Sequence, residues 1–492
     1  IQSKPYLDKI YEDNLKTNHI PSVIYGLVKD GKLLYWNSFG TTNPNDINSK
    51  PTIKSAYRIA SMSKSFTAMA ILKLRDNGLL SLHDDVSNYI PELKQLKPLT
   101  KDSPKLTIYH LLTMQSGYPQ DDPWADRLLN QSRSDFYKLI TSDLTSSYPI
   151  ATEFEYSNLN YAILGEIITR VSGIPYQQYI TNNIFKPLQM NDTVFDCQLV
   201  SSETLVDGYR WEENQFKLEP LLADGTFGAM GGIITTLDDY VKYISYHQSG
   251  SPNSSLYQTY NGPEILLPSS LREMHRSLIH VDVVLNKPST ISTSTSPSTS
   301  PTTITTTPAT FASSMGYSYG LSVWNDTRGV KTVRHAGGLP GFGSEWRFLP
   351  NHGVAIVSFG NKTYAPMDSS NAQAINYLVD NKIIEKRKFP LSDILKKRGE
   401  ELIETIQNNF NNNDLKDIEM FSFNFYLDKP KRLWQQDIKQ LLQTINGIEN
   451  ISEITPENNL RGTFIITGKN NNKLKVFYSM TPENVPKIQY LE

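Results

Sequence analysis

The sequence predicts a protein of the α/β class, more narrowly an α+β fold. We expect an antiparallel sheet flanked by helices, a mostly helical subdomain, and a small carboxy-terminal α+β domain. Short apolar strands at both ends of the first 388 residues, periodic apolar segments between about 61 and 248, and a separate helix-then-strand order in the last hundred residues indicate this fold. We therefore divide the chain into residues 1–388 and 389–492.

The amino-terminal part begins with one helix and one hairpin. Residues 3–17 have the spacing of an amphipathic helix. Residues 22–30 and 32–40 are predicted strands joined at Asp30-Gly31, because an Asp-Gly pair between alternating apolar runs is a strong hairpin signal.

The stretch from Tyr57 to Thr67 runs from a short apolar strand into an alanine-rich helix that ends near Asn77-Gly78. Ser61 should lie on the first helical turn, where unpaired backbone N–H groups favour negative charge, with Lys64 one turn further along the same face. An amine beside a hydroxyl is what a serine nucleophile needs where no histidine takes its proton. The alternative, an N-cap serine next to a solvated lysine, stays open because the Ser-x-x-Lys spacing is common.

The middle of the chain is predicted to be helical. Tyr156-Ser157-Asn158 forms a polar turn entering an apolar helix that runs to about residue 172, and a further helix spans residues 237–248. Read alone, Tyr156 could be a core aromatic residue and Asn158 a helix cap. The polar segment 118–126 and the segment 342–346 are expected to shape any pocket.

A tract of Ser, Thr and Pro at about 288–310 cannot form a core and is predicted to be a flexible or glycosylated insertion. Strand signals resume at 319–324, 330–335, 344–349 and 354–359, followed by a helix at 370–381 that should cover one face of the sheet. The last domain reads as helices at 391–410 and 432–445 with three or four strands after them.

Composition limits the classes of partner. The formal net charge is -2 and the pI is about 6.5, which argues against nucleic acid or an anionic membrane as a partner. No apolar run reaches the ~18 residues of a membrane span. Cys197 is the one cysteine, so no internal disulfide is expected, and neither a zinc site nor a cofactor is predicted.

Several features favour a secreted or lumenal protein. The sequence begins at Ile1 rather than Met, which suggests removal of an upstream segment, and it contains a Ser/Thr/Pro tract. Six Asn-x-Ser/Thr sequons are glycosylation candidates, although chance could produce them in an asparagine-rich chain. They are Asn130, Asn191, Asn253, Asn325, Asn361 and Asn450.

Three motifs occur in a fixed order: Ser61-Met62-Ser63-Lys64, Tyr156-Ser157-Asn158 and His335-Ala336-Gly337-Gly338. With them the sequence resembles the serine β-lactamase and penicillin-binding protein-like superfamily, above all class C β-lactamases, D-alanyl-D-alanine carboxypeptidases, D-aminopeptidases and related esterases. The likeness covers about residues 5–385 and implies a β-lactamase-like sheet. The carboxy-terminal domain resembles cystatin-like or nuclear-transport-factor-like accessory domains in the order of its elements.

The resemblance implies a mechanism built on the first two motifs. Ser61 would attack a carbonyl, with Lys64 and Tyr156 together taking its proton; a neutral lysine or a phenolate needs a depressed pKa. Asn158 would orient Lys64 or the substrate amide.

The third motif is implied to bind the substrate. The backbone N–H groups of Ser61 and Gly338 would hold the oxyanion, and His335 would hold the substrate or polarise Tyr156. His335 stands where β-lactamases carry a lysine that grips a carboxylate, so efficient hydrolysis of β-lactams is not expected.

The sequence therefore predicts a secreted serine hydrolase that acts through an acyl-enzyme. Its substrates would be small molecules or peptides with amide or ester bonds, such as D-amino acid peptides and small esters, with β-lactams as a further candidate. The alternative is a catalytically weak binding or scaffold protein with a β-lactamase fold. The oligomeric state stays open.

Overall fold

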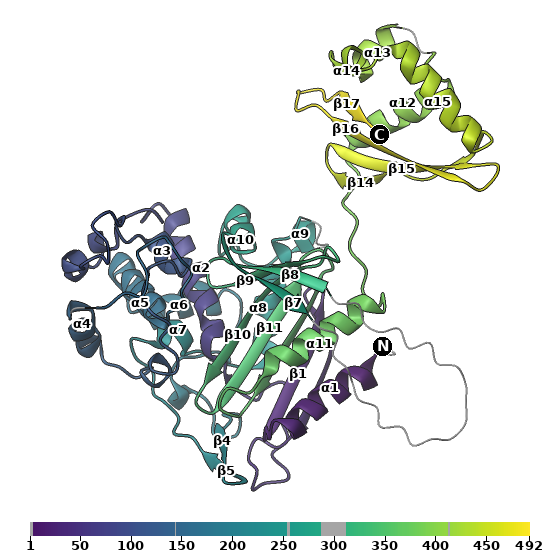
Figure 1. Cartoon of the computed structure of the whole chain (residues 1–492). Helices are drawn as coiled ribbons and strands as arrows, with labels where there is room; N and C mark the ends of the chain where they lie inside the picture. The colour runs from purple at the N-terminus through teal and green to yellow at the C-terminus, as the bar shows by residue number, and fades with distance from the viewer. Residues whose placement is uncertain (1–2, 143, 253–255, 287–310, 412–413) are drawn as a thin grey trace, which may run out of the picture. The chain divides into compact units, whose positions relative to one another are not determined.

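The computed structural model describes residues 3–142, 144–252, 256–286, 311–411 and 414–492. The chain forms two compact units, residues 1–385 and 386–492, each with its own core (Figure 1). This division falls three residues before the predicted boundary at 388.

The first unit contains an eight-stranded antiparallel sheet in the order β2-β1-β12-β11-β10-β9-β8-β7. Both ends of the unit contribute strands to it, as the sequence predicts. The strands are β1 (Ser22–Lys29), β2 (Lys32–Gly40), β7 (Ile279–Asn286), β8 (Phe311–Tyr317), β9 (Ser322–Asp326), β10 (Lys331–Leu339), β11 (Phe342–Leu349) and β12 (Val354–Gly360).

The β1–β2 hairpin is confirmed. Asp30 and Gly31 have φ angles of 51° and 75°, and positive φ at both central residues is the requirement of a type I′ turn, whose twist matches that of the flanking strands.

The far edge of the sheet was predicted incompletely. Strands β7 and β8, on either side of segment 287–310, were missed because polar residues interrupt their apolar alternation. The strand predicted from residue 319 begins only at Ser322, because Gly320 has a φ of 69° within a turn that the Ser318 N–H closes on the Leu321 carbonyl at 2.8 Å. The predicted Ser/Thr/Pro insertion lies outside the described residues.

Alternation along β1 divides the core into two layers. Ile24 and Val28 point into the core shared with the helical subdomain, whereas Val23, Tyr25 and Leu27 point to the opposite face. Helices α1 (Lys4–Thr17) and α11 (Met367–Asp380) cover that opposite face, and α8 (Leu237–Ser249) packs on the first one (Figure 1). All three helices lie within three residues of their predicted bounds.

The helical subdomain is built around α2 (Lys64–Asp76), which packs against α5 (Asn158–Ser172). Both helices end at a glycine with positive φ, Gly78 at 72° and Gly173 at 75°, as expected for a left-handed cap. The shorter helices are α3 (Ile108–Leu112), α4 (Arg133–Thr141), α6 (Tyr176–Ile180), α7 (Gly228–Gly231), α9 (Leu256–Thr259) and α10 (Pro268–Met274), and the two short strand pairs are β3 (Tyr57–Arg58) with β6 (Ile234–Thr235) and β4 (Tyr209–Glu212) with β5 (Gln215–Leu218).

The second unit packs helices on an antiparallel sheet in the order β13-β15-β16-β17, with β14 also paired to β15. Leu395, Leu402 and Ile406 form the buried face of α12, at the spacing of an amphipathic helix. Its elements are α12 (Asp393–Gln407), α13 (Asp414–Met420), α14 (Phe425–Asp428), α15 (Lys431–Thr444), β13 (Ile448–Ile451), β14 (Thr455–Asn458), β15 (Arg461–Gly468), β16 (Lys473–Met480) and β17 (Ile488–Leu491). The described sheet thus exceeds the three or four strands predicted, and its resemblance to a named accessory domain stays a prediction.

The structure contradicts one glycosylation candidate. Asn361 is fully buried, its Nδ2 donates to the carbonyls of Thr42 (2.9 Å) and Asp207 (3.0 Å), and its Oδ1 accepts from the Ser22 N–H at 2.7 Å. An amide that joins three chain segments in this way is out of reach of a glycosyltransferase once the protein has folded. Exposed candidates are Asn130, Asn191, Asn325 and Asn450, while Asn253 lies outside the described residues.

Within the described part of the chain, no helix combines the length and the apolar character that crossing a membrane requires.

Candidate active site

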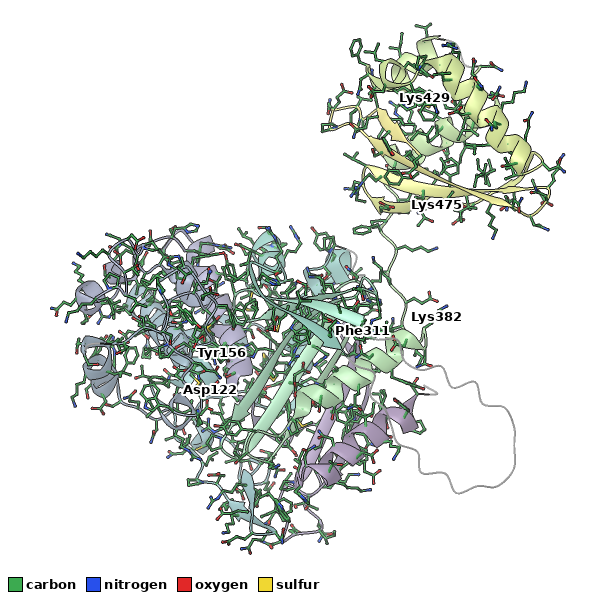
Figure 2. The ribbon with its side chains drawn as sticks, viewed as in Figure 1. Asp122, Tyr156, Phe311, Lys382, Lys429 and Lys475 are labelled. Carbon is green, nitrogen blue, oxygen red and sulfur yellow. The ribbon has the colours of Figure 1, made fainter. Side chains whose placement is uncertain are left out.

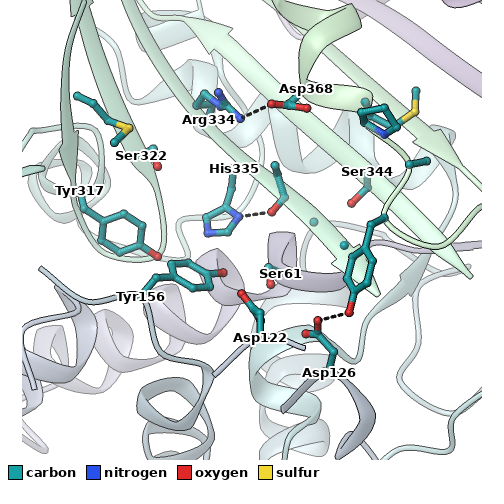
Figure 3. A pocket seen from close by; sticks show the side chains of 18 of the residues that line it. Ser61, Asp122, Asp126, Tyr156, Tyr317, Ser322, Arg334, His335, Ser344 and Asp368 are labelled. Carbon is teal, nitrogen blue, oxygen red and sulfur yellow. Dashed lines mark hydrogen bonds and ion pairs between the residues drawn. The ribbon is translucent and has the colours of Figure 1, made fainter. Parts of the chain in front are cut away.

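Ser61 opens onto a cavity of about 590 Å³ between strand β10 of the large sheet and the helical subdomain (Figure 3). Its walls come from segments far apart in the sequence: the loops around residues 122–126 and 154–156, strands β7 to β11, and the start of α11.

The nucleophile candidate lies on a tight turn. Ala60–Ser63 form a 3-10 turn that precedes α2. Ser61 therefore lies just ahead of the helix, whereas the sequence predicts it within the first turn of the helix. Ala60 has a φ of 50°, an unfavourable value for a residue with a Cβ. The N-cap residues of this turn and of α2 are Ile59 and Ser63, so the N-cap alternative for Ser61 is wrong.

Two neighbouring strands hold this turn in place. The Ser344 hydroxyl on β11 donates to the Ile59 carbonyl at 2.8 Å. On β10, a Cβ at Gly337 would lie only 2.2 Å from the same carbonyl oxygen, so only glycine lets the strand approach this closely. The sheet thereby fixes Ser61 at the cavity wall.

Lys64 is fully buried, which rules out the solvated-lysine alternative. Its Nζ lies 2.8 Å from Ser61 Oγ, 2.6 Å from Asn158 Oδ1 and 3.0 Å from the Met230 carbonyl. Burial lowers the pKa of Lys64 to about 8, against the opposing charges of nearby carboxylates. About a tenth of the lysine is therefore a neutral amine at pH 7, able to accept the serine proton.

Tyr156 lines the same cavity, where the helical subdomain meets the large sheet (Figure 2), with its ring centroid 5.0 Å from Lys64 Nζ. Burial raises the pKa of Tyr156 well above its ordinary value of 10.0, although a hydrogen bond with Ser61 opposes the shift. The phenol thus keeps its proton at neutral pH. Of the two bases that the motifs allow, the geometry and charge favour the lysine amine over a phenolate.

Asn158 is the first residue of α5, but it does not cap the helix. Asp121 does so from another loop, accepting the N–H groups of Asn158 at 2.7 Å and Leu159 at 2.9 Å. The Asn158 side chain is left to link Lys64, through Oδ1, with Asp122, whose Oδ1 accepts from Nδ2 at 2.5 Å. The cap interpretation of Asn158 is therefore wrong.

His335 is neutral. Burial, reinforced by the charge of Lys64, lowers the pKa of His335 to about 3. Its Nδ1 contacts the Ala336 carbonyl at 2.5 Å, which assigns the ring proton to Nδ1 and leaves Nε2 as an acceptor. Gly338, further along β10 and opposite Gly343, also lines the cavity; its role as an oxyanion donor stays a prediction.

The cavity contains residues for which the motifs gave no signal. Tyr317 on β8 and Tyr364 before α11 face it, and Arg334 lies 3.8 Å from Asp368 at its rim (Figure 3). From segment 118–126, which was expected to shape the pocket, Asp122 and Asp126 do so. From segment 342–346 only Ser344 lines the cavity, because the large aromatic side chains there are buried in the core.

Among the described residues, no three His, Cys, Asp or Glu side chains are grouped so that they could hold a metal ion.

Comparison with known proteins identifies the family to which the first unit is similar. The Beta-lactamase family model matches residues 7–379. Protein flp of Staphylococcus aureus (strain N315) is 28% identical over 386 residues, which cover 76% of this chain and 67% of that protein. Beta-lactamase-like protein 4 of Dictyostelium discoideum is 30% identical over 293 residues, 56% of this chain and 51% of that protein.

Two solved structures share the fold. The octameric penicillin-binding protein homologue from Pyrococcus abyssi superposes with a TM-score of 0.62 at 20% identity, covering 98% of this chain and 92% of that one. A penicillin-binding protein from Bacillus halodurans gives 0.56 at 20% identity, covering 76% and 99%.

Proposed function

Because this chain belongs to the β-lactamase family, we propose that it is a serine hydrolase that forms an acyl-enzyme on Ser61. The β-lactamase fold supports a serine hydrolase in general; we propose amide or ester bonds of D-amino acid peptides and small esters as the substrates. The observation that carries the proposal is the 2.8 Å contact between Lys64 Nζ and Ser61 Oγ. The lysine is buried from solvent, and part of it is a neutral amine at pH 7.

The reaction would proceed in two steps. Ser61 Oγ attacks the carbonyl carbon while its proton passes to the neutral amine of Lys64, and the oxyanion is held by the backbone N–H groups of Ser61 and Gly338. Tyr156, still protonated, then gives a proton to the leaving group and recovers one from the serine–lysine pair. Water hydrolyses the acyl-enzyme by the reverse sequence of proton transfers.

The neutral state of His335 bears on the choice of substrate. A cation at this position would attract a substrate carboxylate, whereas an uncharged imidazole offers only a hydrogen bond. This supports amides and esters that present no carboxylate to His335 as substrates over β-lactams, which carry one.

The test is covalent labelling. A fluorophosphonate should add one adduct, mapped to Ser61 by mass spectrometry, and p-nitrophenyl acetate should be hydrolysed with an initial burst. Ser61→Ala should abolish both. Ser63→Ala is the matched control, because Ser63 lies on the same turn but its hydroxyl accepts the Ile233 N–H at 3.2 Å, and this variant should still be labelled.

Unchanged turnover in Ser61→Ala would refute the assignment of the nucleophile. A folded wild-type protein that takes up no adduct would instead support the alternative, a binding or scaffold protein on the same fold.

We also propose that the protein works in the secretory pathway or outside the cell. Four exposed sequons and the Ser/Thr/Pro tract support this. A loss of mass on enzymatic deglycosylation of protein from its natural source would agree with it, and an unmodified mass would count against it.

A further inference from the structure

Two carboxylates that the proposed chemistry does not use face the catalytic cavity. Asp122 is exposed to it, and Asp126, four residues further along the same loop, is only 2% exposed. Figure 3 shows Asp122 beside Ser61, with Asp126 on the side of Ser61 away from Tyr156 and His335. We call Asp122 and Asp126 the carboxylate pair.

Asp126 is incompletely satisfied. Its Oδ2 accepts the Tyr364 hydroxyl at 2.7 Å, and no donor among the described residues reaches its buried Oδ1; a hydrogen bond with Asp122 forms only when one of the two carboxylates is protonated. Leaving a buried carboxylate oxygen without a partner is costly, so such an atom at the wall of a cavity indicates a missing donor. Burial and the charge of Asp122 raise the pKa of Asp126 to about 7. The raised pKa means that Asp126 binds a proton more readily than an ordinary carboxylate, because donors and positive charge around it are too few.

Among the described residues, no Lys, Arg or His side chain forms an ion pair with Asp122 or Asp126, although the charge of Lys64 acts on Asp126. Lys64 contacts Ser61, Asn158 and the Met230 carbonyl rather than either carboxylate. The neighbouring Arg127 is exposed, and its Nη1 lies 4.0 Å from Glu219.

The other cation of the cavity is engaged at the opposite rim. Arg334 lies 3.2 Å from Glu345 and 3.8 Å from Asp368. Apart from a proton on Asp126, a positive group that neutralises the carboxylate pair can therefore come from a bound ligand.

We propose that the carboxylate pair is a subsite for a protonated amine on the acyl portion of the substrate, so that the enzyme prefers aminoacyl amides or esters to neutral acyl compounds. This rests on the proposed function, in which Tyr156 gives a proton to the leaving group. The leaving group then lies on the Tyr156 side of Ser61, and the acyl portion extends to the other side. An ammonium group has three N–H donors, enough to bind Asp126 Oδ1 and Asp122 together. On binding, its hydrogen bonds to water are replaced by charge-assisted hydrogen bonds to two carboxylates in a partly buried site.

The pair is also coupled to the catalytic group. Asp122 accepts a hydrogen bond from Asn158, and Asn158 accepts one from Lys64. The negative charge of Asp122 raises the pKa of Lys64, so a cation bound to Asp122 offsets that charge and lowers the pKa of the lysine. Binding of a cationic substrate thus favours the neutral amine that attack by Ser61 requires.

The test compares two substrates of nearly equal shape. Alanine p-nitroanilide, in both D and L forms, carries an ammonium group where isobutyric acid p-nitroanilide carries a methyl group. The wild-type enzyme should have a kcat/KM about tenfold or more higher for one alanine isomer, as a charge-assisted hydrogen bond in a buried site warrants. Asp126→Asn should reduce the ratio of the two kcat/KM values about tenfold, and Asp122→Asn should also reduce it.

The matched control is Glu153→Gln, which removes an exposed acid from the loop that leads to Tyr156 without touching the cavity. It should leave the ratio as in the wild type. A wild-type enzyme that prefers the isobutyryl compound, or a ratio that Asp126→Asn leaves unchanged, would overturn the subsite.

A second readout separates the subsite from the proposed function. Alanine amide should slow fluorophosphonate labelling of wild-type Ser61 at lower concentrations than isobutyramide does. Labelling without that difference overturns the subsite alone, whereas absence of any labelling overturns the proposed function and the subsite with it.

Discussion

The buried amine of Lys64 makes the rate of Ser61 acylation depend on pH in a predictable way. With a pKa of about 8 for Lys64, the neutral amine is about 1% of the total at pH 6, about 9% at pH 7 and about 90% at pH 9. The second-order rate constant for labelling by an uncharged fluorophosphonate should therefore rise with pH and level off above 8. Asp126 ionises near pH 7 and also raises the pKa of Lys64, so the rise should be shallower than that of one isolated group.

Asp122→Asn tests the cause of this profile. Among the carboxylates that raise the pKa of Lys64, Asp122 has the largest influence, and its asparagine replacement can still accept the hydrogen bond from Asn158. Removing its charge should move the rising limb to lower pH and raise labelling at pH 6 relative to pH 9.

The assay is intact-mass quantification of the adduct at fixed times between pH 6 and pH 9, with Glu153→Gln as the control for removal of one exposed charge. The control should reproduce the wild-type profile. A wild-type rate that does not vary over this range, or a limb that moves to higher pH in Asp122→Asn, would refute the lysine as the base.

Three further predictions concern the fold. Gly337→Ala should lower the free energy of unfolding by about 1–3 kcal/mol and shift the thermal midpoint downward, because its Cβ would lie 2.2 Å from a backbone carbonyl oxygen, whereas Gly231→Ala, with no atom nearer than 3.5 Å, should cost less. Glycopeptide mapping of secreted protein should find Asn361 unmodified; a glycan there would contradict its burial. For Glu166, burial raises the pKa, but hydrogen bonds from two arginines and a tyrosine outweigh it and leave the pKa below the ordinary 4.5. A carboxyl group with a lowered pKa in the folded state stabilises that state at pH values above its unfolded-state pKa, and this stabilisation is lost as pH falls through its folded-state pKa. Glu166→Gln should therefore reduce the thermal midpoint at pH 7 and have little effect at pH 3.

Local features of the sequence were enough to predict much of the fold. The Asp30-Gly31 turn, the glycine after α2 and the periodic apolar faces of α1 and α8 each depend on residues close in the chain, so the sequence alone predicts them. The order of the three motifs likewise predicted the candidate nucleophile and its neighbouring amine.

The tertiary structure decided what the charged and polar groups do. Asn361 has the sequence of an exposed sequon yet joins three segments in the core, and Asp126 has the sequence of a surface loop yet lies almost fully buried at the cavity. Burial shifts the pKa of Lys64 down and that of Tyr156 up, so one is partly neutral and the other stays protonated. Each of these outcomes depends on how much water is excluded and which distant charges approach, and those quantities exist only once the chain has folded.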